Sequence, residues 1–399
     1  MHLKQIKIVN LSVILKPSRE NSVKRFHPWI FSGAISKING NPKDGDLVEV
    51  LDAKQNFLAI GHYYGGSISV KVLSFEKIEI DFDFWFEKLN NAFQVRKKLN
   101  LTETNCYRIV HGEADGLPGL IVDYYNGVVV LQAHSIGMYV ALNQIAEAFK
   151  QIFGNELIAI YSKSKETLPS EFSKTIENEY LFGHCVVPHL VLENGHSFLI
   201  DWETGQKTGF FLDQRLNRKL LQDYAQDKKV LNAFCYSGGF SVYALAAGAK
   251  EVHSIDVSKK AIELTEKNVN ANFRSSDNHQ FICQDVMAYL KQNTEEYEVI
   301  ILDPPAFAKN ISSKHNAIQG YKRLNIEGIK KLKSKGLLFT FSCSQVIDQT
   351  LFYNTIVSAA IETGRKVRVL HQLTQAPDHP INLFHPEGSY LKGLVLEVE

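Results

Sequence analysis

The chain has 399 residues, of which 45% are hydrophobic, 22% are charged and 11% are aromatic. That length exceeds one ordinary hydrophobic core, so two or three domains are expected. The formal net charge of +1 gives no global support for nucleic-acid binding, and any such partner must be argued from local features.

Several classes of protein are excluded at this level. No apolar run approaches the ~20 residues that a membrane-spanning helix needs. Residues 1–15 alternate polar and apolar side chains, which predicts a strand and not a signal peptide. The five cysteines lie far apart and form no Cys-x-x-Cys pair, which argues against a disulfide framework and a zinc site. We therefore expect a cytoplasmic protein with no bound metal.

Three segments with different patterns follow one another. Residues 1–78 read as short strands separated by Gly-, Asn- and Asp-rich turns, which predicts a small β-barrel. Residues 79–190 begin with a helix over 80–100, whose basic run Arg96-Lys97-Lys98 suits the negative end of the helix dipole. Two strands around a Gly/Pro turn, a helix and another strand complete this α+β unit. Residues 191–399 alternate short apolar strands with helices, which predicts a parallel sheet of βαβ units.

A glycine turn ends the first strand of this sheet. The string VLNAFCYSGGF, residues 230–240, runs from a strand into a helix, and its glycines let the backbone approach a ligand closely. Eighteen residues after Gly238, Asp256 ends the next strand, where an acid can accept hydrogen bonds from two ribose hydroxyls. The turn lacks the GxGxxG pattern, which favours a nucleoside without pyrophosphate; an ordinary turn with a helix-capping Asp is the alternative. The turn residues expected at the ligand are Asn232, Phe234, Cys235, Tyr236, Ser237 and Gly238.

Two further acids follow later strands of the same sheet. Asp285 comes after the strand HQFIC, where it either holds an adenine amino group or only caps a helix. Asp303 follows the strand EVIIL and precedes Pro304 and Pro305, which fix a rigid loop at the carboxyl end of that strand. Substrates of open α/β sheets bind at that edge, so we expect Asp303 and Pro304 to face a ligand.

One cysteine stands out among the five. Cys343 lies just past the apolar strand LLFTF, between two serines, at the same sheet edge as Asp303. Most cysteines in strands are inert core residues, but this position suits a nucleophile. Cys235 is its rival, and it lies within the glycine turn, where it would face the cofactor and not the substrate.

Taken in order, these elements resemble the class I S-adenosylmethionine-dependent methyltransferases. More closely, the chain resembles the bacterial ribosomal RNA large-subunit methyltransferase I family, whose members make 5-methylcytidine in 23S rRNA. The string FHPWIFSGAI at residues 26–35 resembles the opening of that family's PUA domain, an RNA-binding β-barrel. The string YRIVHGEADGLPGLIVD at 107–123 resembles its central domain, and GQKTGFFLDQR at 205–215 resembles the segment that closes over the cofactor.

The resemblance implies an α/β fold with three domains. These are a PUA β-barrel over residues 1–78, a central α+β domain over 79–190 and a Rossmann-like methyltransferase domain over 191–399. It also implies S-adenosylmethionine as the cofactor and RNA, namely 23S rRNA, as the partner. A homodimer is one assembly that the sequence leaves open.

The resemblance also assigns roles to individual residues. Asp256 would bind the ribose, Asp285 the adenine, and Cys343 would attack the substrate base, which Asp303 would hydrogen-bond. Many RNA 5-methylcytosine enzymes carry a second cysteine after the acid-Pro-Pro loop, but Ala306 follows here, so the base that removes the C5 proton is not identified. The residues implied to shape the cofactor pocket are Lys207, Thr208, Gly209, Phe211 and Asp213.

Two other functions remain open. Acid-Pro-Pro loops also serve enzymes that methylate base nitrogens, which need no cysteine, so Cys343 discriminates against this reading. The second alternative is a non-catalytic RNA-binding protein with a vestigial methyltransferase domain. The presence of all four expected site residues argues against this alternative: Asp256, Asp285, Asp303 and Cys343. A nicotinamide oxidoreductase is less favoured because the pyrophosphate fingerprint is missing.

Overall fold

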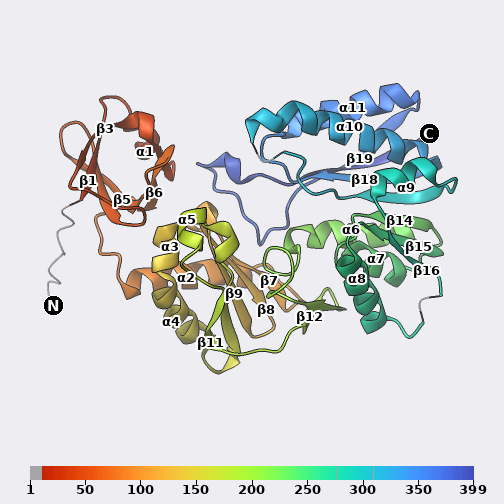
Figure 1. The fold of residues 1–399 in the computed structure, drawn as a ribbon, viewed down its shortest axis with the longest axis horizontal. Helices are drawn as coiled ribbons and strands as arrows, with labels where there is room; N and C mark the ends of the chain where they lie inside the picture. Colours follow the sequence, from red (N-terminus) through yellow and green to blue (C-terminus); the bar gives the residue numbers. More distant parts are fainter. Residues whose placement is uncertain (1–10, 276, 309) are drawn as a thin grey trace. The chain divides into compact units, whose positions relative to one another are not determined.

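The computed structural model describes residues 11–275, 277–308 and 310–399 (Figure 1). The strand expected at the N-terminus is present from Ser12, and its first ten residues lie outside the described part. The chain divides into two compact units. Two segments that follow residue 190 belong to the first unit, whereas the sequence analysis placed all residues from 191 onward in one domain. Unit 1 comprises the chain up to His189, Ile200–Gly209 and Pro377–Gly388; unit 2 comprises Leu190–Leu199, Phe210–Ala376 and Ser389–Glu399.

Unit 1 opens with a six-stranded mixed sheet of order β2-β6-β5-β4-β1-β3. Alternating valines and leucines of these strands are buried in one small core, as the two-residue period of the sequence requires. The strand pattern expected over residues 1–78 is therefore present. Its elements are β1 (Ser12–Leu15), α1 (Asn21–Lys24), β2 (Trp29–Phe31), β3 (Ile35–Asn39), β4 (Leu47–Leu51), β5 (Phe57–Tyr63) and β6 (Ile68–Ser74).

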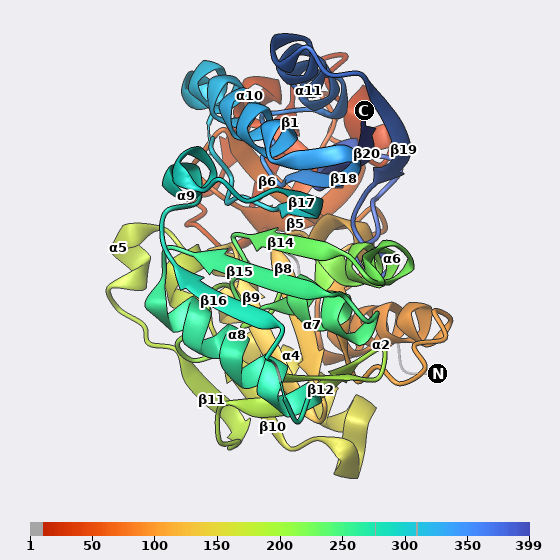
Figure 2. The same cartoon turned by 90° about the vertical axis from the view of Figure 1, so that its right-hand side faces the viewer.

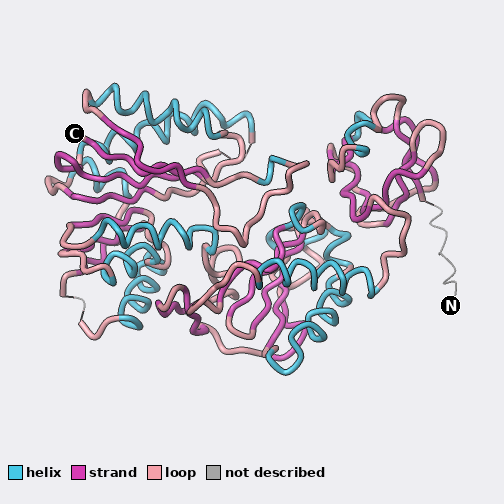
Figure 3. The backbone as a smooth tube through the Cα atoms, turned by 180° about the vertical axis from the view of Figure 1, so that it is seen from behind, coloured by secondary structure: helices cyan, strands magenta, loops and turns pink. Residues whose placement is uncertain are grey.

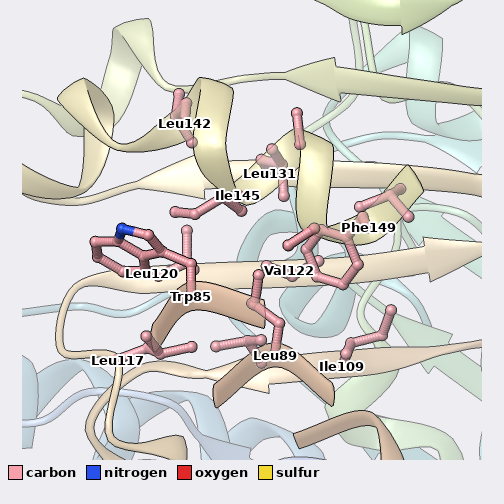
Figure 4. Close-up of a cluster of buried hydrophobic side chains, with 14 of the residues drawn as sticks. Trp85, Leu89, Ile109, Leu117, Leu120, Val122, Leu131, Leu142, Ile145 and Phe149 are labelled. Atoms are coloured by element: carbon pink, nitrogen blue, oxygen red, sulfur yellow. The ribbon is translucent and has the colours of Figure 1, made fainter. Parts of the chain in front are cut away.

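The rest of unit 1 is a five-stranded sheet, β11-β10-β9-β8-β7, covered by α2 and α4, whose apolar faces supply Trp85, Leu89, Ile145 and Phe149 to the core (Figure 4). Three strands stand where two were predicted, because Asn126 and Gly127 take positive φ values of 45° and 90° and turn β8 back into β9. The elements are α2 (Phe82–Lys97), β7 (Cys106–His111), β8 (Leu120–Tyr125), β9 (Val128–Ala133), α3 (Ile136–Val140), α4 (Leu142–Phe153), β10 (Ala159–Ser162), α5 (Ser170–Ser173) and β11 (Glu179–Gly183).

Arg96 lies in the last turn of α2, as its sequence context predicted, and it also holds a distant segment of the chain. Its side chain is buried and forms an ion pair with Asp115. Its guanidinium also donates to the carbonyl oxygens of Arg108 and Asp378, each at 3.0 Å. Asp378 returns a hydrogen bond, since its carboxylate accepts the Arg108 amide at 3.0 Å. A segment that follows Arg96 by 282 residues is thus fixed within unit 1.

Unit 2 is a seven-stranded sheet of order β16-β15-β14-β17-β18-β20-β19 (Figure 2). The predicted parallel sheet is confirmed for β14 to β18, whereas β20 runs antiparallel between β18 and β19. A short hairpin of β12 (His189–Glu193) and β13 (His196–Ile200) precedes it. Its strands are β14 (Lys229–Ala233), β15 (Glu251–Asp256), β16 (His279–Cys283), β17 (Tyr297–Leu302), β18 (Leu332–Ser342), β19 (Val367–Leu373) and β20 (Lys392–Val398).

Helices cover both faces of this sheet (Figures 2 and 3). Along β17, Ile300 and Leu302 pack with α9, α10 and α11, whereas Val299 and Ile301 pack with α6 and α7. The strands are therefore apolar on both faces, as parallel strands in such a sandwich must be. In the described part of the chain, no helix is long and apolar enough to cross a membrane. The helices are α6 (Arg215–Ala225), α7 (Gly239–Ala246), α8 (Lys259–Asn272), α9 (Val286–Gln292), α10 (Lys314–Lys330) and α11 (Gln349–Thr363).

Candidate active site

The candidate site lies at the carboxyl edge of the parallel strands in unit 2. In the register of the sheet, Ala233 of β14 pairs with Leu302 of β17, which in turn pairs with Thr340 of β18. The residues that directly follow these strands therefore leave the sheet on the same side. This arrangement brings the glycine turn, Asp303 and Cys343 to one edge, as the sequence predicted.

The glycine turn is held in a strained but well-supported conformation. Gly238 has φ 73°, and a Cβ atom there would lie 2.6 Å from Cγ2 of Thr265, so only glycine fits. Tyr236 also has a positive φ, of 47°. The Asp256 carboxylate accepts the amide of Tyr236 at 3.1 Å and the amide of Ser258 at 2.9 Å. Asp256 thus supports the turn, and a carboxylate oxygen that accepts one hydrogen bond retains a second lone pair for a ligand hydroxyl.

The other predicted turn residues differ in what their side chains do. Asn232 donates to Oγ of Ser241 at 2.8 Å within the protein. Cys235 is buried, its sulfur lies 3.4 Å from Oγ1 of Thr265, and burial raises the pKa of this thiol to about 12. Such a thiol is inert, which leaves the Cys235 backbone to line the turn. Phe234, half-buried, packs on the core beside α10 and α11, and Ser237 is buried.

Asp285 is exposed and caps α9, where its carboxylate accepts the amide of Ala288 at 2.8 Å. The capping role that the sequence left as an alternative is therefore present. This cap uses one carboxylate oxygen and is compatible with a second hydrogen bond to a ligand amino group.

Asp303 is half-buried and accepts a hydrogen bond from Nε2 of Gln214 at 3.0 Å. Burial, reinforced by the negative charge of Asp213, raises the pKa of Asp303 to about 7, and the Gln214 hydrogen bond only partly offsets this rise. At neutral pH this carboxyl therefore exchanges readily between its neutral and charged forms. Pro304, next in the chain, is buried and fixes the strand exit.

Asp213 offers a test of whether a cofactor fits. One carboxylate oxygen accepts the Tyr390 hydroxyl at 2.6 Å, whereas the other is buried with no hydrogen-bond partner among the described residues. A buried acceptor of this kind calls for a donor, which a ligand with hydroxyl or ammonium groups supplies. Nearby, the ring of Phe211 meets that of Tyr236 edge-on at 5.2 Å, so this segment joins the glycine turn within unit 2.

The remaining residues of the same motif belong to unit 1. Thr208 is buried, and its hydroxyl donates to the Asp123 carboxylate at 2.6 Å. Gly209 has φ 112°, and a Cβ atom there would lie 2.7 Å from Ile200. Lys207 is exposed and also has a positive φ, of 53°. Their contribution to the cofactor pocket stays a prediction.

Cys343 is half-buried directly after β18. The next residue, Ser344, donates its hydroxyl to the carbonyl oxygen of Ala308 at 2.7 Å and so ties the Pro-Pro loop to the end of β18. Burial raises the pKa of Tyr321 to about 12, and the charges of Cys343 and Asp303 both add to this rise. One buried tyrosine therefore interacts electrostatically with both groups that are expected to act on a substrate.

Four site residues were missed by the sequence analysis. Gln214 holds Asp303, Tyr390 holds Asp213, and Lys392 lies beside Cys343. Arg218 donates to the Phe211 carbonyl at 3.0 Å while it is paired with a buried glutamate. Only Gln214 carried a signal, because it lies inside the quoted string at residues 205–215; the others follow no recognisable motif.

A sheet of this order, with a glycine turn, an acid at the end of the next strand and an acid-Pro-Pro loop at one edge, is the arrangement of a class I S-adenosylmethionine-dependent methyltransferase. Comparison with known proteins agrees: residues 107–381 match the model of an S-adenosylmethionine-dependent methyltransferase family, and residues 13–75 match a PUA-like domain. The chain belongs to the ribosomal RNA large subunit methyltransferase I family, and S-adenosylmethionine is its cofactor.

Individual relatives match almost end to end. The chain is 39% identical to "Ribosomal RNA large subunit methyltransferase I" of Alteromonas mediterranea, with 98% of this chain and 99% of the relative covered. The protein of the same name from Aeromonas hydrophila subsp. hydrophila is 38% identical, with coverages of 97% and 99%. The crystal structure of SMU.776 complexed with SAH has a TM-score of 0.84 and 25% identity, with 97% of this chain and 100% of that one covered.

The raised pKa of Asp303 predicts a stability cost that depends on pH. The unfolded chain loses this proton near pH 4 and the folded protein near pH 7, so ionisation costs the folded state progressively between these values and fully above them. We expect Asp303→Asn to raise the free energy of unfolding by roughly 2–4 kcal/mol at pH 8, with the gain shrinking toward pH 4. Urea unfolding at pH 5 and pH 8 measures this difference.

Asp285→Asn is the matched control, because asparagine also caps helices and Asp285 is exposed. Its stability should stay within about 0.5 kcal/mol of wild type at both pH values. An Asp303→Asn protein no more stable at pH 8 than at pH 5, relative to wild type, would contradict the raised pKa.

Proposed function

We propose that the protein methylates C5 of a cytidine in 23S rRNA through a transient bond between Cys343 and C6 of the base. The full-length relatives carry the name of ribosomal RNA large subunit methyltransferases, which supports the RNA substrate. The observation that carries the chemistry is that Asp303 and Cys343 follow two neighbouring parallel strands and so lie at one sheet edge.

The chemistry needs both groups. Cytosine C5 is a weak nucleophile, and a thiolate that adds to C6 makes C5 electron-rich. In its neutral form, Asp303 donates its proton to the pyrimidine N3 and accepts from the exocyclic amino group, which stabilises the charge that forms as Cys343 adds. Bound S-adenosylmethionine supplies the electrophilic methyl group. A base then takes the C5 proton, the electron pair of that C–H bond restores the C5–C6 double bond, and the C6–S bond breaks to release the Cys343 thiolate.

The cofactor residues take roles that their surroundings support. Asp256 bonds the ribose hydroxyls with the lone pairs that the turn amides leave, and Asp285 accepts from the adenine amino group. The unpartnered oxygen of Asp213 accepts from the amino-acid ammonium of the cofactor. The remaining pocket residues in this proposal are Lys207, Thr208, Gly209, Phe211, Asn232, Phe234, Cys235, Tyr236, Ser237, Gly238, Asp303 and Pro304.

Asp256→Ala should weaken binding of S-adenosylmethionine, because two ribose hydroxyls lose an acceptor and the Tyr236 amide loses its support. The loss should be about 10- to 100-fold in Kd, from the 1.5–3 kcal/mol typical of hydrogen bonds to a charged group. Isothermal titration calorimetry measures it, and Asp277→Ala, at an exposed acid outside the site, serves as control. Equal affinities for Asp256→Ala and wild type would remove Asp256 from the ribose.

RNA contact is expected on an aromatic surface of unit 1. Phe26, Phe31 and Phe384 are each about half exposed, at 50%, 49% and 48%. The ring centroids of Phe26 and Phe384 lie 5.4 Å apart, and those of His27 and Phe31 lie 6.2 Å apart. The adjacent Arg25 is exposed and available to phosphate. Exposed rings beside a cation suit unpaired bases, which stack on them.

Phe26→Ala and Phe384→Ala should each weaken binding of a single-stranded rRNA fragment about 10-fold, because stacking is worth roughly 1–3 kcal/mol per base. Fluorescence anisotropy at two salt concentrations measures the affinity. Ile361→Ala, which removes a 74% exposed apolar side chain on α11, should leave it unchanged. Equal losses from all three variants would mean that the surface has no specific role.

Cys343→Ser should abolish methyl transfer to rRNA without unfolding the protein, because the change is nearly isosteric and a hydroxyl adds poorly to C6. Cys235→Ser should keep substantial activity, since that thiol is buried within the glycine turn, where its sulfur contacts Thr265. RNA with 5-fluorocytidine at the target should trap a covalent adduct, because fluorine at C5 blocks the final elimination. Gel shift under denaturing conditions and peptide mass mapping detect the adduct at Cys343.

The same experiment separates the alternatives. A Cys343→Ser protein that methylates at a near wild-type rate would make the cysteine structural and favour methylation of a base nitrogen. Absence of methyl transfer from the wild-type protein to rRNA, with RNA binding retained, would favour the non-catalytic reading.

A further inference from the structure

A buried lysine lies beside the cysteine that follows β18. Lys392 opens β20 and pairs with Ser342 in the antiparallel ladder between β18 and β20. Its side chain is only 6% exposed. Its Nζ donates to the carbonyl oxygen of Ser344 at 2.7 Å and to that of Tyr390 at 2.5 Å. The strand ladder thus holds the Lys392 backbone beside Ser342, and the hydrogen bond to Ser344 holds the amine beside the residue that follows Cys343.

The surroundings disfavour a permanent positive charge on this amine. Burial lowers the pKa of Lys392 to about 8, while the negative forms of Cys343 and Asp348 raise it in part. Tyr321, which burial keeps neutral, interacts with both Cys343 and Asp303, and Asp303 follows the strand next to β18. Lys392 is thus a buried cationic group that interacts with Cys343.

We propose that Lys392 and Cys343 share one proton, so that the amine accepts it when the thiolate forms. The S–H bond of Cys343 breaks, an N–H bond forms on Nζ, and the electron pair left on sulfur becomes available for addition. An uncharged thiol and amine thereby become a thiolate beside an ammonium, and the proton returns when the thiolate is protonated again. The shared proton does not depend on the proposed function. Only the role of the resulting thiolate, as the group that attacks the base, rests on it.

The pairing explains why an amine is buried at this place. An isolated ammonium in a low-dielectric site is costly, whereas an ammonium formed together with an adjacent thiolate is compensated. A cation next to a cysteine lowers the thiol pKa and raises the fraction of reactive thiolate at neutral pH. The adjacent backbone carbonyls hold Nζ in place in both protonation states, because a neutral amine still has two N–H donors.

The test is the pH dependence of alkylation at each cysteine, which needs neither RNA nor cofactor. Iodoacetamide reacts with thiolates, and peptide mass spectrometry reports the rate at Cys343 and, as an exposed internal reference, at Cys283. We expect the midpoint for Cys343 in the wild-type protein to lie below that for Cys283. Lys392→Met, which keeps length and loses the amine, should raise the Cys343 midpoint by about one pH unit and slow alkylation at pH 7 about 10-fold.

Two further variants complete the design. Lys392→Arg keeps a cation and should preserve a low midpoint in part, whereas Lys366→Met, at an exposed lysine of the same domain, should change nothing. A Cys343 midpoint equal to or above that of Cys283 in the wild type would overturn the proposal, even if Lys392→Met failed to fold. An unchanged midpoint in folded Lys392→Met would do the same. If Lys392→Met has a raised alkylation midpoint at Cys343 but keeps full methyl transfer, the result would support the proton-sharing pair and would argue against Cys343 as the nucleophile.

Discussion

The constraint on which the site depends is the common direction of β14, β15, β17 and β18. Parallel strands in register release their next residues on one side of the sheet, so groups that are far apart in the sequence meet without any direct link. Asp303 and Cys343 need only to follow their strands to become neighbours. The antiparallel β20 then brings Lys392 to the same edge from the opposite direction.

The groups at this edge are held in states that the protein interior disfavours. Asp303 lies near a second carboxylate, and Lys392 is buried away from water. Both conditions persist because uncharged supports surround them: an amide at Asp303, and backbone carbonyls at Lys392. The supports keep each group in position without fixing its charge, which is what proton transfer at neutral pH requires.

The sequence predicted those residues of the site that lie directly after an apolar strand, where the strand and the residue can be recognised together. Asp256 and Asp303 come at the end of a clear apolar run, and Gly238 lies in the turn after another, so the local pattern was enough to place them. Lys392 could not be found in this way, because its relevance comes from a ladder with a strand formed fifty residues earlier in the chain. The same holds for the fold: the parallel sheet followed from alternation, but the antiparallel insertion and the third strand of the 107–135 region depend on pairing and on positive φ at Asn126.

The return of residues 377–388 to unit 1 has a consequence for biosynthesis. Arg96 leaves the ribosome early, but the Asp378 carbonyl that completes its hydrogen bonding is made 282 residues later. At about 5–20 residues per second, this interval lasts on the order of tens of seconds. During that time the Arg96 guanidinium can pair with Asp115 but lacks its hydrogen bond to the Asp378 carbonyl. Unit 1 therefore reaches its final packing only after residues 377–388 have been synthesised, and not in the order in which its strands emerge.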